Sequence, residues 1–144
     1  MEVLVRVVRA GAVLPGHAHD GDVGCDLVAA EGCTLRANGG RAMVPTGLCV
    51  AIPEGHGGFV LPRSGLAATH GVTCVNSPGL IDPGYRGEVK VALVNLDAER
   101  DYVVHAGDRI AQLVVLRVTP TEFSLVDALP ESRRGEGGFG SSGR

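Results

Sequence analysis

The segment 62–67, PRSGLA, combines residue types that suit phosphate binding. Arg63 supplies a planar cation, Ser64 a hydroxyl group, and Gly65 a backbone that a ligand can approach closely. At the start of a helical turn such a set can hold phosphate oxygens through charge-assisted hydrogen bonds. The segment is therefore a candidate phosphate site.

A second candidate site lies in residues 76–91, between two segments of strand character. Asn76 can donate and accept hydrogen bonds at once, as recognition of a base edge requires. Asp82, in a sheltered turn, is a candidate general base. Tyr85 and Lys90, the only lysine, add a phenol and an amine. The alternative is a stiff hairpin in which the Asp-Pro-Gly sequence is simply a turn.

Three further residues could serve either a site or the fold. Asp26 lies inside an apolar strand pattern, and a buried carboxylate is costly unless paired, so we expect a specific partner. The alternative is a hydrogen-bonded turn aspartate. Arg109 and Gln112 are three apart on a strand-like segment, which puts them on opposite faces. At most one of them is then expected to face a given site.

The elements that must position these residues are short strands. Apolar segments rich in β-branched residues alternate with turn sequences, which is typical of a sandwich or barrel. The single expected helix is residues 64–70, with Ser64 as its cap. The expected strands, besides the one around Asp26, are residues 3–8, 42–44, 48–52, 59–61, 72–75, 89–94, 102–104 and 110–118.

The C-terminal segment differs in composition from the rest. Residues 131–144 read ESRRGEGGFGSSGR, in which Phe139 is the only apolar side chain. Such a segment cannot bury enough apolar surface to offset its ordering entropy. It has GxxxxG spacing but Ser141 where a P-loop needs lysine. We expect one domain over residues 1–130 and a flexible arm over 131–144.

Composition excludes several classes of protein. The net charge of -3 gives no support for binding to a nucleic-acid backbone. No apolar segment approaches the ~20 residues that span a bilayer, and no secretory signal is expected. Four cysteines without a CxxC pair indicate reduced thiols in a cytoplasmic protein; a zinc site is the alternative.

Five segments, in this order, resemble the trimeric dUTP pyrophosphatase (dUTPase) family. They read GCDLVA, PRSGLA, GLIDPGYRGEVKV, GDRIAQLV and RGEGGFGSSG, and they span residues 24–143. The resemblance implies a jelly-roll-like β-sandwich or distorted barrel that forms a homotrimer with active sites between subunits. It also implies Mg²⁺-dependent hydrolysis of dUTP to dUMP and pyrophosphate, which limits uracil incorporation into DNA and supplies dUMP for dTTP synthesis.

The same resemblance implies roles for individual residues. Asp82 would activate the water that attacks the α-phosphate. Asn76 and the backbone of Leu80 and Ile81 would read uracil, and Tyr85 would pack under the deoxyribose. Mg²⁺ would be held by substrate phosphates and waters, with Asp26 near its water shell. The other implied substrate contacts are Arg63, Ser64, Gly65, Lys90 and Gln112, and in the arm Arg134, Phe139, Gly140, Ser141 and Ser142, with Phe139 stacked on uracil.

Two rival functions are open to a chain of this pattern. A dCTP deaminase has a similar fold, but it needs a glutamate base where this sequence has Ala92. A catalytically idle relative that regulates a protein partner would tolerate the loss of Asp82 or of the arm, and both are present. The residues therefore favour the dUTP hydrolase.

Overall fold

Ten strands and one helix make up the part of the chain that the computed structural model describes, residues 1–138. This confirms the predicted all-β class with one short helix. The elements are β1 Leu4–Val7, β2 Cys25–Val28, β3 Cys33–Leu35, β4 Arg41–Ala51, β5 His56–Pro62, α1 Ser64–His70, β6 Val72–Cys74, β7 Gly79–Ile81, β8 Glu88–Asn95, β9 Tyr102–Val104 and β10 Arg109–Arg117.

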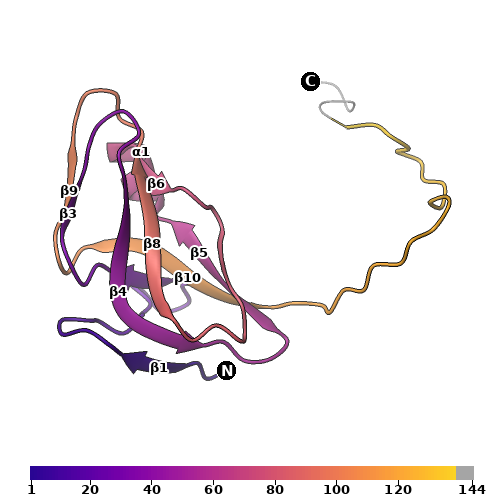
Figure 1. Cartoon of the computed structure of the whole chain (residues 1–144), viewed down its shortest axis with the longest axis horizontal. Helices are drawn as coiled ribbons and strands as arrows, with labels where there is room; N and C mark the ends of the chain where they lie inside the picture. The colour runs from indigo at the N-terminus through magenta and orange to yellow at the C-terminus, as the bar shows by residue number, and fades with distance from the viewer. Residues whose placement is uncertain (139–144) are drawn as a thin grey trace.

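The strands form two four-stranded antiparallel sheets and one two-stranded sheet (Figure 1). The strand orders are β1-β4-β8-β6, β2-β10-β5-β7 and β3-β9. Buried aliphatic side chains from all three sheets form a single core. Leu27 and Ile110 come from one large sheet, and Val44 and Leu93 from the other. The predicted jelly-roll-like sandwich is confirmed, and over residues 1–138 the sheets stay open rather than closing into a barrel.

β4 is one long strand where the sequence predicted two. Its register against β8 shifts between Pro45 and Cys49, so the residues left between the two expected strands form a bulge within one strand. The Thr46 hydroxyl stabilises the bulge: it donates to the carbonyl of Val89 at 2.7 Å and accepts from the backbone N–H of Leu48 at 3.3 Å. The hydroxyl thus replaces ladder hydrogen bonds that the bulge removes.

The helix α1 has the predicted bounds but not the predicted cap. Ser64 is its first helical residue, and the N-cap is Arg63, which makes no side-chain capping hydrogen bond. The helix ends at Gly71, whose left-handed φ of 65° is the usual conformation at this position. The Ser64 hydroxyl is therefore not engaged as a cap.

The segment after β10 runs away from the sheets (Figure 1). Every residue from 119 to 136 is exposed. The last strand ends at Arg117, well before residue 130. The end of the strands therefore does not test the predicted domain boundary at residue 130, which stays a prediction. In residues 1–138 the longest helix is the short α1, and none could cross a bilayer.

Candidate active site

Asp26 is the centre of a cluster of polar side chains. Its carboxylate is buried and accepts hydrogen bonds from Nη1 of Arg109 at 3.1 Å and Nε2 of Gln112 at 3.4 Å. Nε of Arg63 lies 3.6 Å from the same carboxylate. Nη1 of Arg63 also donates to the Arg109 carbonyl at 2.7 Å. Asp26 therefore has the charged partners that its burial requires.

The charges of this cluster do not cancel. Two guanidinium groups share one carboxylate, so a net positive charge remains. The Arg63 and Arg109 side chains are 26% and 52% exposed, so both can be reached from solvent. Guanidinium groups bind phosphate oxygens through paired N–H donors. The cluster is thus suited to anionic phosphate groups.

Arg109 and Gln112 lie on the same face of β10, so the prediction that they lie on opposite faces is wrong. β10 pairs with β2 in the register Gln112 with Asp26 and Arg109 with Val28, with an irregularity directly after Arg109. The additional residue, Ile110, resets the alternation of the strand. Both side chains therefore lie on the face that carries Asp26, and the sequence has no signal that marks the bulge.

A cavity of ≈ 110 Å³ lies beside β7 and the start of β8. It brings together the residues that the resemblance assigns to base and sugar binding. Its polar and backbone lining comes from Asn76, Leu80, Ile81, Tyr85, Glu88 and Lys90. The cavity is therefore the candidate pocket for a nucleoside.

One wall of this cavity is an edge strand. β7 pairs with β5 through Ile81 with Gly58 and Leu80 with Phe59, and it is the last strand of its sheet. An edge strand presents backbone N–H and C=O groups that have no partner in the sheet. A planar ring with alternating donors and acceptors can bind to such groups.

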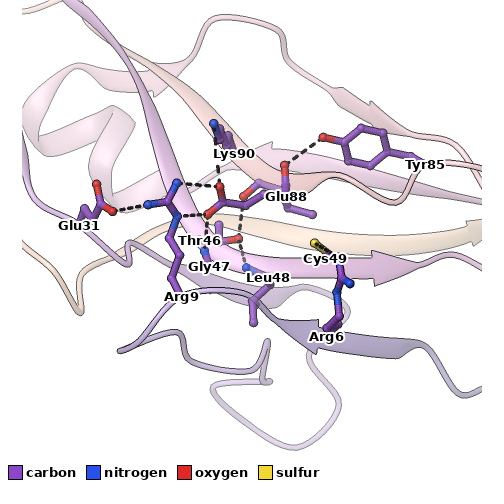
Figure 2. Close-up of polar contacts among 11 residues, drawn as sticks. Arg6, Arg9, Glu31, Thr46, Gly47, Leu48, Cys49, Tyr85, Glu88 and Lys90 are labelled. Carbon is purple, nitrogen blue, oxygen red and sulfur yellow. Dashed lines mark hydrogen bonds and ion pairs between the residues drawn. The ribbon is translucent and has the colours of Figure 1, made fainter.

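Tyr85 and Asp82 lie on the turn that joins β7 to β8. The Tyr85 hydroxyl donates to the backbone carbonyl of Glu88 at 3.0 Å (Figure 2), which fixes the ring against the start of β8. The Asp82 carbonyl accepts from the Tyr85 N–H at 3.0 Å and closes the turn. The Asp82 side chain is exposed, and among residues 1–138 its carboxylate makes no hydrogen bond or ion pair. This carboxylate is available to a water molecule.

The cluster around Asp26 and the cavity remain separate groups. Across the described residues, no hydrogen bond or ion pair joins them, and no cluster residue lines the cavity. Ser64 and Gly65 are exposed beside Arg63. Arg134 donates to the Gly137 carbonyl at 2.7 Å, within the C-terminal segment. The other predicted arm contacts, Phe139, Gly140, Ser141 and Ser142, lie outside the described residues.

The chain's oxygen donors suit a metal that the substrate carries. In the described part of the chain, no group of three or more His, Cys, Asp or Glu could form a metal cage. The Asp26 carboxylate is already engaged by two guanidinium groups and an amide. Mg²⁺ commonly keeps several waters and binds substrate phosphates with few protein ligands. The donor set fits an ion held in that way.

Arg9 and Glu88 are paired beside the cavity, and neither was predicted from the sequence as a site residue. They are far apart in the chain, and no local pattern relates them. The hydrogen bond from Arg9 is the main cause that lowers the pKa of Glu88, with the Gly47 N–H and the nearby charges of Arg9 and Lys90 adding to it. This carboxylate therefore stays ionised and engaged.

A profile of the dUTPase family matches residues 11–143. The chain is 56% identical over 130 residues to the deoxyuridine 5'-triphosphate nucleotidohydrolase of Leifsonia xyli, covering 90% of this chain and 85% of that protein. The structure of Staphylococcus bacteriophage 80alpha dUTPase with dUPNHPP has a TM-score of 0.90, 30% identity and 99% coverage of both chains. A mutant dUTPase of S. aureus phage phi11, described with a structural Mg(II) ion, has a TM-score of 0.82, 25% identity and coverage of 91% of this chain and 100% of its own. The chain belongs to the dUTPase family.

Proposed function

We propose that this protein hydrolyses dUTP to dUMP and pyrophosphate. The observation that carries the proposal is the cavity in which Asn76, the edge strand β7 and Tyr85 meet. Family membership and a relative with a bound dUTP analogue support the same substrate. In the cell the reaction would limit uracil incorporation into DNA and supply dUMP for dTTP synthesis.

The base and sugar are recognised by the cavity. Uracil offers one N–H donor between two carbonyl acceptors, which matches the Asn76 amide and the backbone of Leu80 and Ile81. A pocket that excludes one methyl group gains only ~1–3 kcal/mol, so hydrogen bonds and steric closure act together against thymine. Tyr85 packs under the deoxyribose and leaves no room for a 2′-hydroxyl.

Hydrolysis needs a positioned water and stabilised phosphate charge. The Asp82 carboxylate accepts a proton from the water, and the water oxygen bonds to the α-phosphorus. The bond from that phosphorus to the bridging oxygen breaks, and pyrophosphate leaves with the electron pair. In the described residues the Asp82 carboxylate is not engaged by another group, and this supports Asp82 as the base.

The triphosphate is held by the cationic cluster and the start of α1. Arg63 and Gln112 contact its oxygens, Ser64 and Gly65 add hydroxyl and backbone donors, and Lys90 contacts substrate from the cavity side. Asp26 would lie near the water shell of a Mg²⁺ ion bound to these phosphates, and that ion would offset part of their charge. The phi11 enzyme is described with a structural Mg(II) ion, which supports binding of magnesium by a protein of this fold.

A homotrimer with active sites between subunits accounts for the separation of the cluster and the cavity. In a trimer, the cavity of one chain and the Asp26 cluster of a second chain would form one site. Two shallow apolar hollows of ≈ 380 and ≈ 300 Å³ on the β1-β4-β8-β6 sheet support contacts between copies. The arm would then reach a neighbour's site, where Phe139 stacks on uracil and Arg134, Ser141 and Ser142 close over the phosphates, with Gly140 between them.

The residues that line the cavity give no support for a deaminase function. The glutamate that lines it, Glu88, is bound by Arg9 and so is not free to move a proton. Ala92, which lines the same cavity, is at the position to which the resemblance assigns the deaminase base, and it carries no titratable group.

A cytoplasmic location accords with the four free cysteines, Cys25, Cys33, Cys49 and Cys74.

The test is a substrate panel with pyrophosphate detection in the presence of Mg²⁺. We expect rapid pyrophosphate release from dUTP, with dTTP, dCTP and UTP as poor substrates. Comparable turnover of dCTP with release of ammonia would contradict the proposal. Sedimentation at micromolar protein, in which we expect a trimer, tests the assembly separately.

A further inference from the structure

Glu88 is bound through both its side chain and its main chain (Figure 2). Nε and Nη2 of Arg9 donate to Oε1 and Oε2 of Glu88, at 2.6 and 3.1 Å. The backbone N–H of Gly47 donates to the same Oε1 at 3.0 Å. On its main chain, Glu88 accepts the hydroxyl hydrogen bond of Tyr85. The residue that anchors Tyr85 is therefore itself fastened to the segment after β1 and to β4.

This arrangement is sheltered and directional. The Glu88 side chain is only 13% exposed, and that of Arg9 is 38% exposed. A guanidinium that meets a carboxylate through two N–H groups fixes orientation as well as distance, which a lysine does not reproduce. The pair can therefore hold a strand end in one position.

The part of β4 that contacts Glu88 is also held in one conformation. Gly47 lies in the β4 bulge with a φ of 73°, and a β-carbon there would come within 2.7 Å of the Ala12 β-carbon. The neighbouring Thr46 hydroxyl binds the carbonyl of Val89, the residue after Glu88. The start of β8 is thus held at two successive residues.

We propose that Arg9 and Glu88 are positioning residues. They fix the position of the Tyr85 ring in the cavity, and this position sets the enzyme's preference for deoxyribose over ribose. The inference rests on the proposed function, in which Tyr85 packs under the sugar. Without the Arg9 contact, the Glu88 carbonyl can shift, and the ring that hydrogen-bonds to it shifts as well. A purely structural pair would affect stability but not the ratio of two substrates.

Three variants and one matched control test this. Arg9→Met and Glu88→Gln disrupt the paired contact, and Arg9→Lys keeps the charge without the planar fork. Glu31→Gln is the control, because Glu31 is an exposed second partner of Arg9 that leaves the Glu88 contact in place. The measurements are kcat and KM for dUTP and UTP, with circular dichroism to verify folding.

We expect Arg9→Met and Glu88→Gln to raise KM for dUTP more than they change kcat, and to lower the ratio of kcat/KM for dUTP over UTP by about tenfold. Arg9→Lys should be intermediate, and Glu31→Gln should resemble the wild type. Folded variants with the wild-type ratio would overturn the inference. A wild-type enzyme that does not release pyrophosphate from dUTP would overturn the proposed function itself, a different and separately visible result.

A second readout does not depend on activity. The chain has two tyrosines, Tyr85 and Tyr102, so fluorotyrosine labelling gives two NMR signals. We expect the mild Arg9→Lys change to move the Tyr85 signal and leave that of Tyr102 in place. An unmoved Tyr85 signal in that variant would also count against the inference.

Discussion

The phenol end of Tyr85 lies close to Gly87, on the side where a side chain of residue 87 would project. A β-carbon on residue 87 would come within 2.5 Å of the phenol oxygen and 2.7 Å of Cζ, closer than real β-carbons approach other atoms. Glycine is therefore the residue that lets the hydroxyl reach the Glu88 carbonyl. The position of the Tyr85 ring therefore depends on the absence of a side chain at residue 87.

Gly87→Ala should displace Tyr85 and weaken discrimination between sugars. We expect kcat/KM for dUTP to fall by about 10- to 100-fold, because a small misplacement at a site is costly, and the preference over UTP to shrink. Gly84→Ala is the control, since Gly84 lies in the same turn with open space around it. Equal kinetics for the two variants would show that the ring position is unimportant.

Asp82→Asn should separate binding from chemistry. The amide keeps the size of the side chain but cannot take a proton from water, so we expect kcat to fall by about 10²–10⁴-fold. Affinity for dUTP, measured by calorimetry, should change little. A wild-type turnover rate in this variant would rule out Asp82 as the base.

Deletion of residues 131–144 should leave a folded trimer that has lost most of its activity. The last strand of the described chain ends at Arg117, so over residues 131–138 the deletion removes no strand or helix. In the proposed mechanism the arm excludes water and closes over the phosphates, so we expect the deletion to remove both contributions. Circular dichroism and sedimentation report the fold, and pyrophosphate release reports activity; full activity would show that the arm has no catalytic role.

Asp97 should make stability depend on pH at the acid end. Hydrogen bonds from the backbone N–H of Glu99 and from the side chain and N–H of Arg100 lower the Asp97 pKa from 3.8 to about 2. The ionised form is the stabilising one, so its contribution is complete above the unfolded value and is lost as the pH falls toward 2. Urea unfolding of the wild type and Asp97→Asn should therefore differ near neutral pH and converge near pH 2.

Asn95→Asp should destabilise the fold. The fully buried Asn95 amide donates to the carbonyls of Leu35 at 3.1 Å and Arg100 at 2.8 Å. A carboxylate would face both carbonyl oxygens without a donor, which should lower the free energy of unfolding by about 3 kcal/mol or more. Denaturant unfolding measures this, and a loss that shrinks as the new carboxyl is protonated would identify the cause.

The sequence predicted the features that depend on neighbouring residues. β-branched segments became strands, and residues 64–70 became the single helix, because alternation and turn residues act locally. The residue types of the 62–67 and 76–91 segments also indicated phosphate and base chemistry. These signals need no knowledge of distant contacts.

The rest depends on bulges and on contacts between distant segments. One additional residue, Ile110, brings Arg109 and Gln112 to one face, and simple alternation predicted the opposite. The pairing of Arg9 with Glu88 across the fold has no local signature. The separation of the Asp26 cluster from the cavity beside β7 within one chain also follows from strand order, which spacing does not reveal.

The segment after β10 runs away from the sheets (Figure 1), and in the proposed trimer it would act as a tether. Residues 118–138, at about 3.3 Å per residue, can span about 70 Å when extended. A tethered arm meets its site at an effective concentration of about millimolar, whatever the concentration of the enzyme. Dilution should therefore leave closure intact while the trimer holds, and a free peptide of the same sequence should replace a deleted arm only at comparable, millimolar concentration.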